Sequence, residues 1–326
     1  MVALYLTSLE NGNGKTTVGA GLGKHWLDKG KKVGYFKPIL ADSKQPAARD
    51  ADSDVAFIKQ LFALKEPLDL ISPVFSNESN LKTHIKEAYA KVSAGKDVVI
   101  IEGLAGSGQA SRSIVEALDA RVIIVAVYSK EPLKINDRDF GKNLLGIVWN
   151  KVPRNRLEQV RTQTALPILG ILPEDRTLFA PTVGELAEHL HGEFLTGADK
   201  TDQLVENFML GAHIVDHGPD YFGIKANKAV ILRGERPDMQ LAALETSTSC
   251  LVLTDNQAPT LHVRIRADEK KVPLILTRDS INTVAASVEG LPGTTRFNQP
   301  AKLPRLSQIM EQHFDFATVD KTLGLP

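Results

Sequence analysis

Six nearly uninterrupted apolar runs constrain the fold more than any other feature of the sequence. They are rich in β-branched residues and lie at residues 2–8, 33–39, 97–103, 121–128, 144–152 and 167–173. Half-exposed strands alternate between apolar and polar residues. These runs do not, which is typical of parallel strands covered on both faces. Helix-like stretches separate them, at residues 15–29, 53–64, 78–94, 111–118, 154–165 and 183–190. The alternation predicts a doubly wound α/β domain.

A shorter βα series follows and predicts a second, smaller α/β domain. Its strands are expected at residues 229–234, 250–256 and 272–278, and its helices at residues 237–245 and 280–290. Pro237 and Ser280 are residue types that favour helix starts. The predicted organisation is a domain at 1–192, a linker at 193–203, a domain at 204–291 and a C-terminal tail at 292–326. The tail is expected to carry one helix near 304–314 and a loose end.

The charge balance argues against two classes of partner. The 326 residues include 39 Lys and Arg and 39 Asp and Glu, so the formal net charge is zero. A neutral chain lacks the basic excess that nucleic acids and anionic membranes attract. The longest apolar run, at residues 122–128, is far shorter than a bilayer span. We therefore expect neither a nucleic acid nor a membrane as a partner.

The cysteine content indicates a compartment. Cys250 is the only cysteine, so no disulfide can form within one chain. The N-terminus does not resemble a secretory signal. Together these features predict a cytoplasmic protein.

The first apolar run leads into a glycine-rich loop and a helix, which predicts a phosphate-binding loop. The loop ends in Gly14, Lys15 and Thr16, the most specific part of a Walker A motif. Lys15 is expected to reach the β- and γ-phosphates of ATP or GTP, and Thr16 to bind Mg²⁺. Glycine allows the turn and asparagine tolerates left-handed backbone. The other expected nucleotide contacts are Asn11, Gly12, Asn13 and Thr17.

The opening of the loop departs from the usual motif. The strict spacing places Leu9 where the first glycine stands, and a spacing one residue longer places Ser8 there.

Several charged residues are candidates for binding magnesium or phosphate. Glu102 ends an apolar strand, where a Walker B carboxylate holds Mg²⁺ beside a phosphate loop. Asp50, Asp52 and Asp54 precede or begin a helix, and helix capping explains at least one of them. Residue types alone do not select a magnesium ligand among the three. Lys37 follows the second strand and is either a surface lysine or a charge used in chemistry.

Residues 1–190 resemble the dethiobiotin synthetase family of P-loop NTPases. The matching motifs occur in the family's order and read GNGKTT, GYFKPI, DSDVAF, VVIIEG and GIVWNKV. The resemblance implies the longer loop spacing, with Ser8 at the first glycine. It also implies that Asp54 and Glu102 are magnesium acids, that Lys37 is a catalytic lysine and that Asn150 contacts adenine.

The whole chain resembles the N-terminal half of long bacterial phosphate acetyltransferases. The motifs GILPEDRTLFAPTVGELAEHL and GERPDMQLAALETSTSCLVLTDN carry the resemblance. In that family a dethiobiotin-synthetase-like domain precedes a DRTGG domain, to which residues 204–291 are similar. The resemblance implies a regulatory, nucleotide-sensing role, because the acyl-transfer chemistry lies in a further C-terminal domain. We expect a stand-alone protein without that domain.

Two functions follow from these motifs. The first is a regulator that binds Mg-ATP or Mg-GTP and senses a small ligand or a protein partner through its second domain. The second is an ATP-dependent ligase of the dethiobiotin type, in which Lys15 and Lys37 stabilise a phosphoryl group passing to a carboxylate or carbamate. A glutamine-dependent amide ligase would need a reactive cysteine, whereas Cys250 lies in a strand and reads as a core residue.

The second domain has one candidate ligand site. Arg233, Arg236 and Asp238 lie between a strand and a helix, where the helix N-terminus could bind an anion. A solvated turn is the competing explanation. We also expect a homodimer, as is common in related folds.

Overall fold

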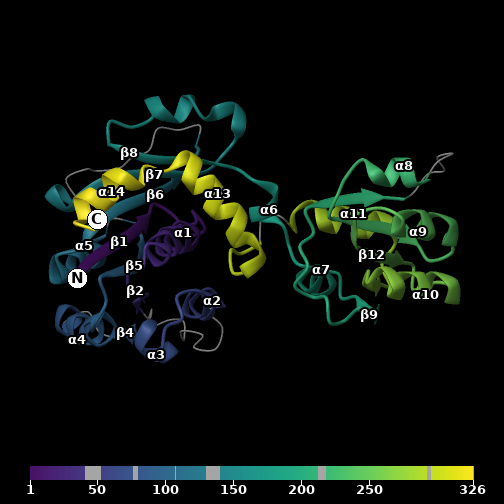
Figure 1. Ribbon diagram of the computed structural model, residues 1–326, viewed down its shortest axis with the longest axis horizontal. Helices are drawn as coiled ribbons and strands as arrows, with labels where there is room; N and C mark the ends of the chain where they lie inside the picture. Colours follow the sequence, from purple (N-terminus) through teal and green to yellow (C-terminus); the bar gives the residue numbers. More distant parts are fainter. Residues whose placement is uncertain are drawn as a thin grey trace. The chain divides into compact units, whose positions relative to one another are not determined.

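The chain folds into two α/β units, each built on its own sheet (Figure 1). The computed structural model describes residues 1–40, 53–75, 80–106, 108–129, 140–211, 218–291 and 295–325. The first unit contains Met1–Glu174 and Phe297–Pro326, and the second contains Asp175–Arg296. In these described ranges, no helix has the length and hydrophobicity that a membrane span requires.

The sheet of the first unit confirms the predicted parallel strands. It has the order β2-β5-β1-β6-β7-β8, and every pairing is parallel. The connection that leaves β1 runs toward β2, and the one that leaves β5 runs the other way, toward β6. The carboxyl ends of β1 and β5 therefore lie at the switch point where such sheets bind ligands. The strands are β1 (Val2–Ser8), β2 (Val33–Phe36), β5 (Val98–Ala105), β6 (Arg121–Val127), β7 (Leu144–Val152) and β8 (Ile168–Pro173).

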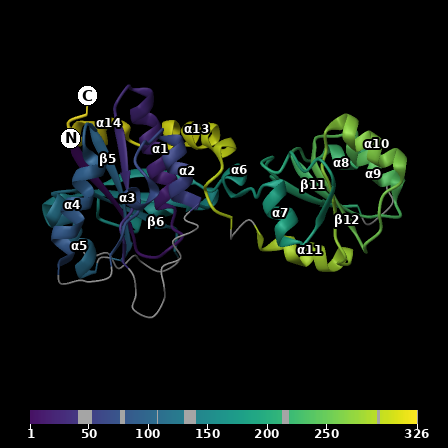
Figure 2. The ribbon, with the colours of Figure 1, turned by 90° about the horizontal axis from the view of Figure 1, so that it is seen from below.

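Helices cover both faces of this sheet (Figure 2). α4 (Leu81–Ser93) and α5 (Gln109–Leu118) bury their apolar stripes against β1, β2 and β5 on one face. α1 (Lys15–Asp28) packs closely on the other face, where Gly19 leaves room for Leu6 and Ile100. Shorter elements complete this part: α2 (Ser53–Leu61), α3 (Leu68–Ile71), η3 (Gly141–Asn143), and β3 (Ile39–Leu40) paired with β4 (Val74–Phe75).

The helix predicted at residues 154–165 is wrong. The structure has two 3₁₀ turns there, η4 (Arg154–Arg156) and η5 (Gln159–Thr162). Val160 is the one fully buried apolar residue of the stretch. An α-helix here would have no apolar stripe to pack against the unit, and packing supplies most of a helix's stability.

The second sheet is parallel except at one edge. Its order is β10-β11-β12-β13-β9, with β9 antiparallel to β13. The strands are β10 (Asn207–Leu210), β11 (Lys228–Arg233), β12 (Thr248–Thr254), β13 (Leu274–Leu276) and β9 (Glu193–Thr196). Because β10 to β13 follow sequence order, right-handed crossovers place their connecting helices on one face.

Figure 2 shows the resulting layers of the second unit. The connecting helices α8 (Gly218–Gly223), α9 (Pro237–Leu244) and α10 (Leu261–Lys270) cover one face. α7 (Val183–His189) and α11 (Ile281–Glu289) cover the other, and a short α6 (Arg176–Phe179) precedes them. Pro237 begins α9 and Ser280 caps α11, as predicted. Cys250 is fully buried in β12, which confirms its interpretation as a core residue, and burial raises the pKa of its thiol to about 12.

The structure divides the chain differently from the predicted domain boundaries. Residues 193–203, predicted as a linker, include β9, which extends the second sheet. The helix predicted at residues 183–190 is α7, and it packs on the second sheet rather than the first. The short apolar segments in this region pack against strands that lie much later in the sequence. Local periodicity does not reveal such contacts.

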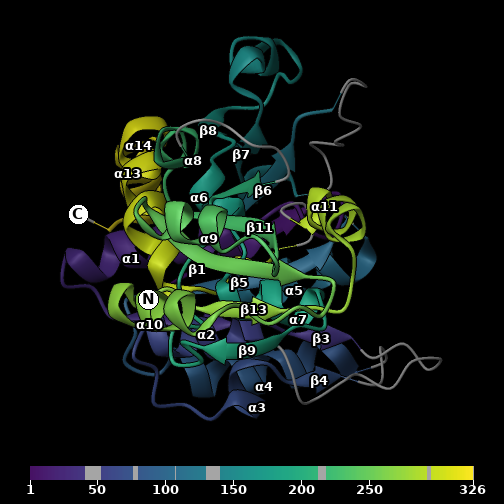
Figure 3. The ribbon, with the colours of Figure 1, turned by 90° about the vertical axis from the view of Figure 1, so that its right-hand side faces the viewer.

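The predicted C-terminal tail belongs to the first unit. η6 (Pro300–Lys302) leads into α13 (Leu303–His313) and α14 (Phe316–Leu323), which lie beside α1 and β8 (Figure 1, Figure 3). The helix expected near residues 304–314 is therefore present, but the loose end is wrong. Gly21 of α1 leaves space for Met310, since a Cβ there would lie 1.9 Å from the Met310 sulfur.

Asp320 fastens α14 to the C-terminal end of α1. Its carboxylate accepts hydrogen bonds from Trp26 Nε1 (2.7 Å) and Lys29 Nζ (2.8 Å), and the His25 ring stacks on Phe316 at 3.8 Å between centroids. Burial would raise the pKa of Asp320, but the bonds from Lys29, Trp26 and His25 outweigh it and lower that pKa. The charged form is thus favoured in the folded unit.

Lys228 is a fully buried lysine at the start of β11. Its ammonium donates hydrogen bonds to Thr246 Oγ1 (2.9 Å) and Ser247 O (2.7 Å), and no carboxylate in the described ranges forms an ion pair with it. Burial lowers the pKa of Lys228 from 10.5 to about 8. Folding therefore favours the neutral amine.

This lysine makes stability depend on pH in a defined window. Between pH about 8 and 10.5 the unfolded chain holds a proton on Lys228 that the folded chain releases. Stability rises with pH wherever the unfolded state binds more protons, so the wild type should gain stability relative to Lys228→Met across this window. The full shift corresponds to ~3 kcal/mol. Guanidinium denaturation of both proteins at about pH 7.5 and about pH 10 checks this; a constant difference would contradict it.

Candidate phosphate-binding site

The loop between β1 and α1 has the backbone that the glycines predicted. Gly12 (φ +80°) and Gly14 (φ +90°) lie in the left-handed region, which favours glycine. Asn11 and Asn13 do not adopt this conformation, so the expected use of asparagine for left-handed backbone is wrong. Gly14 also faces β7, since a Cβ there would lie 2.1 Å from Asn150 Nδ2.

Lys15 reaches back across the loop from the first residue of α1. Its Nζ lies 2.8 Å from Ser8 Oγ at the end of β1, and Ser8 Oγ donates to Glu10 O at 2.6 Å. Burial lowers the pKa of Lys15; the nearby Glu102 raises it and Lys37 lowers it further. The ammonium is therefore desolvated and bonded to a neutral hydroxyl, a state that an incoming phosphate would stabilise.

Glu102 is the centre of the polar cluster. The residue is buried, at 7% exposure, on β5, directly beside β1. Oε2 accepts from Thr16 Oγ1 at 2.9 Å and from Tyr35 OH at 2.5 Å, and Oε1 lies 3.2 Å from Lys37 Nζ. The structure therefore brings Thr16, Lys37 and Glu102 together, as the motifs predicted.

Sequence reasoning missed Tyr35. It is buried on β2 two residues before Lys37. Residues two apart on a strand point to the same face. That spacing was the available signal: once Lys37 was a candidate, alternation placed the Tyr35 hydroxyl on the same side.

Asn150 and Lys151 hold the loop from the end of β7. Asn150 Nδ2 donates to Asn13 O at 3.0 Å, and Lys151 Nζ donates to Gly12 O at 3.0 Å. Asn150 is buried, and its expected contact with adenine stays a prediction. Lys151 was not a candidate from the sequence, because its partner is a backbone carbonyl far away in the chain.

The residues present fit a magnesium ion that arrives with a phosphate. Mg²⁺ prefers oxygen ligands and usually binds through one or two carboxylates together with phosphate and water. The Thr16 hydroxyl and the Glu102 carboxylate are such ligands and already touch. In the described ranges, no group of three or more His, Cys, Asp or Glu side chains could hold a metal. A magnesium ion at Thr16 and Glu102 would therefore take its remaining ligands from phosphate and water.

The structure says less about the other residues of the first unit that were predicted to bind nucleotide or magnesium. Thr17 is buried in the first turn of α1. Asp54 lies in the first turn of α2 and is half-buried, so its role as a second magnesium acid stays a prediction. Asp50 and Asp52 lie outside the described residues.

The predicted site of the second unit is only partly assembled. Arg236 makes two hydrogen bonds to the Asp238 carboxylate, at 2.9 and 2.7 Å, and these two charges neutralise each other. Arg233 instead lines a hollow of about 260 Å³ at the carboxyl ends of β11 and β12, with Gly234, Glu235, Asp255 and Gln257. Two carboxylates and one guanidinium surround this hollow, which does not favour an anion. The ligand role of Arg233, Arg236 and Asp238 stays a prediction.

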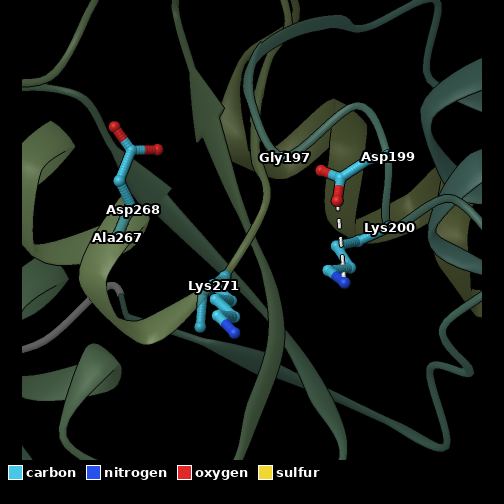
Figure 4. Close-up of a pocket in the computed structure, with 7 residues that line it drawn as sticks. Gly197, Asp199, Lys200, Ala267, Asp268 and Lys271 are labelled. Atoms are coloured by element: carbon cyan, nitrogen blue, oxygen red, sulfur yellow. Dashed lines mark ion pairs between the residues drawn. The ribbon is translucent and has the colours of Figure 1, made fainter.

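A second hollow of the same unit lies between the segment that follows β9 and the C-terminal end of α10 (Figure 4). Its volume is also about 260 Å³, and its charged lining residues are Asp199, Lys200, Asp268 and Lys271. Asp199 and Lys200 form an ion pair of 3.6 Å. The two signs of charge are equal in number, and the hollow contains none of the predicted site residues.

Comparison with known proteins places this site in a family. A family model described as an AAA domain matches residues 2–182, more than half of the chain. The chain belongs to this AAA-domain family. A model described as a DRTGG domain matches residues 185–291, which confirms the predicted second domain and extends its start. The AAA-domain match contains the phosphate loop, Glu102 and the β7 residues that hold the loop.

Relatives of the whole chain confirm its resemblance to phosphate acetyltransferases. The phosphate acetyltransferase of Nitratidesulfovibrio vulgaris is 22% identical over 368 residues, which cover 98% of this chain and 51% of that protein. That of Pseudomonas putida is 22% identical over 370 residues and covers 100% and 52%. The chain thus spans about half the length of these curated relatives.

The chain is also similar to solved structures. One is the MinC:MinD cell division protein complex of Aquifex aeolicus, with 19% identity and a TM-score of 0.37, covering 55% of this chain and 83% of that chain.

The two loop glycines should respond differently to alanine. Gly12→Ala meets nothing within 4 Å, so we expect only the left-handed backbone penalty, ~1 kcal/mol of unfolding free energy. Gly14→Ala adds a Cβ that displaces Asn150 and breaks its bond to Asn13, so we expect a loss of roughly 2–4 kcal/mol. Urea denaturation without nucleotide measures both. Equal losses would show that Asn150 does not hold the loop.

Proposed function

We propose that the first unit binds ATP or GTP with Mg²⁺, and that the chain acts as a nucleotide sensor with a regulatory second unit. The carrying observation is the Thr16–Glu102 hydrogen bond of 2.9 Å beside the loop that holds Lys15. It brings together the hydroxyl and the carboxylate that a Mg-nucleotide site requires. The DRTGG match supports the regulatory role of the second unit.

Each residue has a distinct part in this proposal. Lys15 exchanges its bond with Ser8 for one to the β- and γ-phosphates. The left-handed glycines let loop N–H groups converge on the phosphate oxygens. Mg²⁺ held by Thr16 and Glu102 would neutralise phosphate charge. Lys37 Nζ, 3.2 Å from Glu102 Oε1, supplies a positive charge beside that carboxylate.

A ligase of the dethiobiotin type is the second candidate function. Lys37 favours it, because its ammonium lies in the same cluster as Glu102 and Thr16, where it could stabilise a phosphoryl group in transfer. The two functions differ in stoichiometry. A ligase forms one phosphorylated or cyclised acceptor for each ADP, whereas a sensor releases ADP slowly or not at all, with or without an acceptor diamino acid. An acceptor-dependent burst of ADP would replace the sensor proposal.

The partners of the second unit are proposals as well. A small ligand or a protein partner is expected there, and a homodimer is expected for the whole chain. Static light scattering of the full chain gives its mass in solution, and a monomer at micromolar concentration would contradict the homodimer. Mass spectrometry of molecules that co-purify with the protein would identify a retained ligand of either unit.

Removal of the Lys15 charge should abolish nucleotide binding. Lys15→Ala deletes the buried ammonium that faces the phosphates, and a charge-assisted bond to a phosphate is among the stronger polar interactions. We expect a loss of at least about a hundredfold in Mg-ATP or Mg-GTP affinity by calorimetry. Lys24→Ala, at a partly exposed position of the same helix where the lysine pairs with Asp28, is the matched control and should bind like wild type. Unchanged affinity in Lys15→Ala would remove the proposed site.

Glu102→Gln should affect the metal more than the nucleotide. The amide keeps the shape of the side chain but loses the charge that attracts Mg²⁺. We expect a roughly tenfold higher magnesium concentration for half-maximal nucleotide binding, with a smaller change in metal-free affinity. Titration of Mg²⁺ at fixed nucleotide measures the shift. Identical magnesium curves would make Glu102 a structural residue only.

A further inference from the structure

A β-bulge lies where β7 reaches the phosphate loop. Along the β7–β8 pairing, Trp149 is opposite Ile171 and Val152 is opposite Pro173. Two residues of β7 therefore face one residue of β8, and those two are Asn150 and Lys151. Lys151 has φ +55°, the left-handed conformation that a side chain rarely adopts. Bulges of this kind commonly redirect side chains next to functional sites.

The bulge explains an unusual geometry of two neighbouring side chains. On a regular strand, consecutive side chains point to opposite faces. Here Asn150 and Lys151 both reach the same loop and bond to the adjacent carbonyls of Asn13 and Gly12, each at 3.0 Å. An extra residue and a left-handed backbone are what bring both donors to the same side. A non-glycine residue is strained in this left-handed conformation, so the fold retains a local strain at this point.

We propose that Lys151 is a positioning residue that holds the phosphate-binding loop in its nucleotide-competent shape; this rests on the function proposed above. By bonding Gly12 O from outside the loop, Lys151 directs that carbonyl away from the phosphate position. Peptide planarity then turns the N–H group that follows Gly12 in the opposite direction, toward the phosphate. Asn150 does the same for the next peptide. Lys151 therefore acts through the loop and not by contact with the reacting phosphate.

The charge of Lys151 is consistent with this role. Burial lowers the pKa of its ammonium, so the folded unit disfavours the charged form at this place. The strain and the partial desolvation both oppose the observed position, and the bond to the loop is an interaction that offsets them. A glycine at this position would remove the backbone strain and would also lack the ammonium that donates to the loop.

Three variants separate positioning from simple structural support. Lys151→Met keeps the aliphatic stem and removes the donor, Lys151→Arg keeps a donor, and Lys151→Gly removes both donor and backbone strain. Lys271→Gly is the matched control. Lys271 has φ +56° and is exposed at the C-terminal end of α10 in the second unit, so its replacement relieves the same strain away from the loop.

Calorimetry with Mg-ATP, Mg-GTP and magnesium tripolyphosphate, together with nucleotide-free thermal unfolding, tests the proposal. We expect Lys151→Met and Lys151→Gly to bind nucleotide and tripolyphosphate about tenfold more weakly, by the same factor for each ligand. Lys151→Arg should stay within about threefold of wild type. Lys151→Gly should keep a nucleotide-free Tm close to that of Lys271→Gly, and Lys271→Gly should bind like wild type.

The other outcomes overturn different statements. Wild-type affinity in Lys151→Met refutes the positioning role. A loss confined to nucleotides, with tripolyphosphate unaffected, means that Lys151 contacts the nucleoside instead of shaping the loop. A large fall in the nucleotide-free Tm of Lys151→Gly, matched by the loss of affinity, means that Lys151 supports the fold only. If wild type binds neither Mg-ATP nor Mg-GTP, the proposed function fails, whatever the variants do.

Discussion

The buried carboxylate of Glu102 is the group on which the first unit's site depends. A carboxylate removed from water is costly unless hydrogen-bond donors and a positive charge surround it. Tyr35 on β2 and Lys37 just after it supply these, and Thr16 supplies one from α1. The requirement to satisfy one charge therefore fixes the relative positions of β2, β5 and α1. It also places the hydroxyl and the carboxylate of the proposed magnesium site in contact.

Both ends of α1 are fixed, by contacts of different origin. At its N-terminal end, Lys15 bonds to Ser8, and the preceding loop is held from β7. At its C-terminal end, Trp26 and Lys29 bond to Asp320, which the chain supplies almost 300 residues later. Packing of Met310 over Gly21 fills the space between. A helix held at both ends presents its first-turn N–H groups at a defined place, which is what anion binding at a helix N-terminus needs.

Much of this arrangement could be predicted from the sequence because it depends on local signals. Continuous apolar runs identified the parallel strands, and Gly14, Lys15 and Thr16 identified the loop. What could not be predicted depends on contacts between distant segments. β9 and α14 are short, and they become ordered by packing against elements formed elsewhere in the chain. Lys151 could not be identified because a bulge changed the direction of its side chain, and no spacing rule for a regular strand anticipates that.

The two segments that connect the first unit to the second give the sensor proposal a physical basis. The chain leaves the first unit after β8, where Glu174 N bonds to Val152 O, the residue next to Lys151. It returns through α13, which packs on α1. The segment that leaves the first unit is thus bonded to β7, which holds the phosphate loop. The segment that returns to this unit includes α13, which packs on α1, the helix that follows the loop. A ligand that tightens the loop against β7 and α1 therefore acts on the two elements to which both connections are attached. A coupling between nucleotide and second unit needs such a shared element, one whose equilibrium both sites can bias.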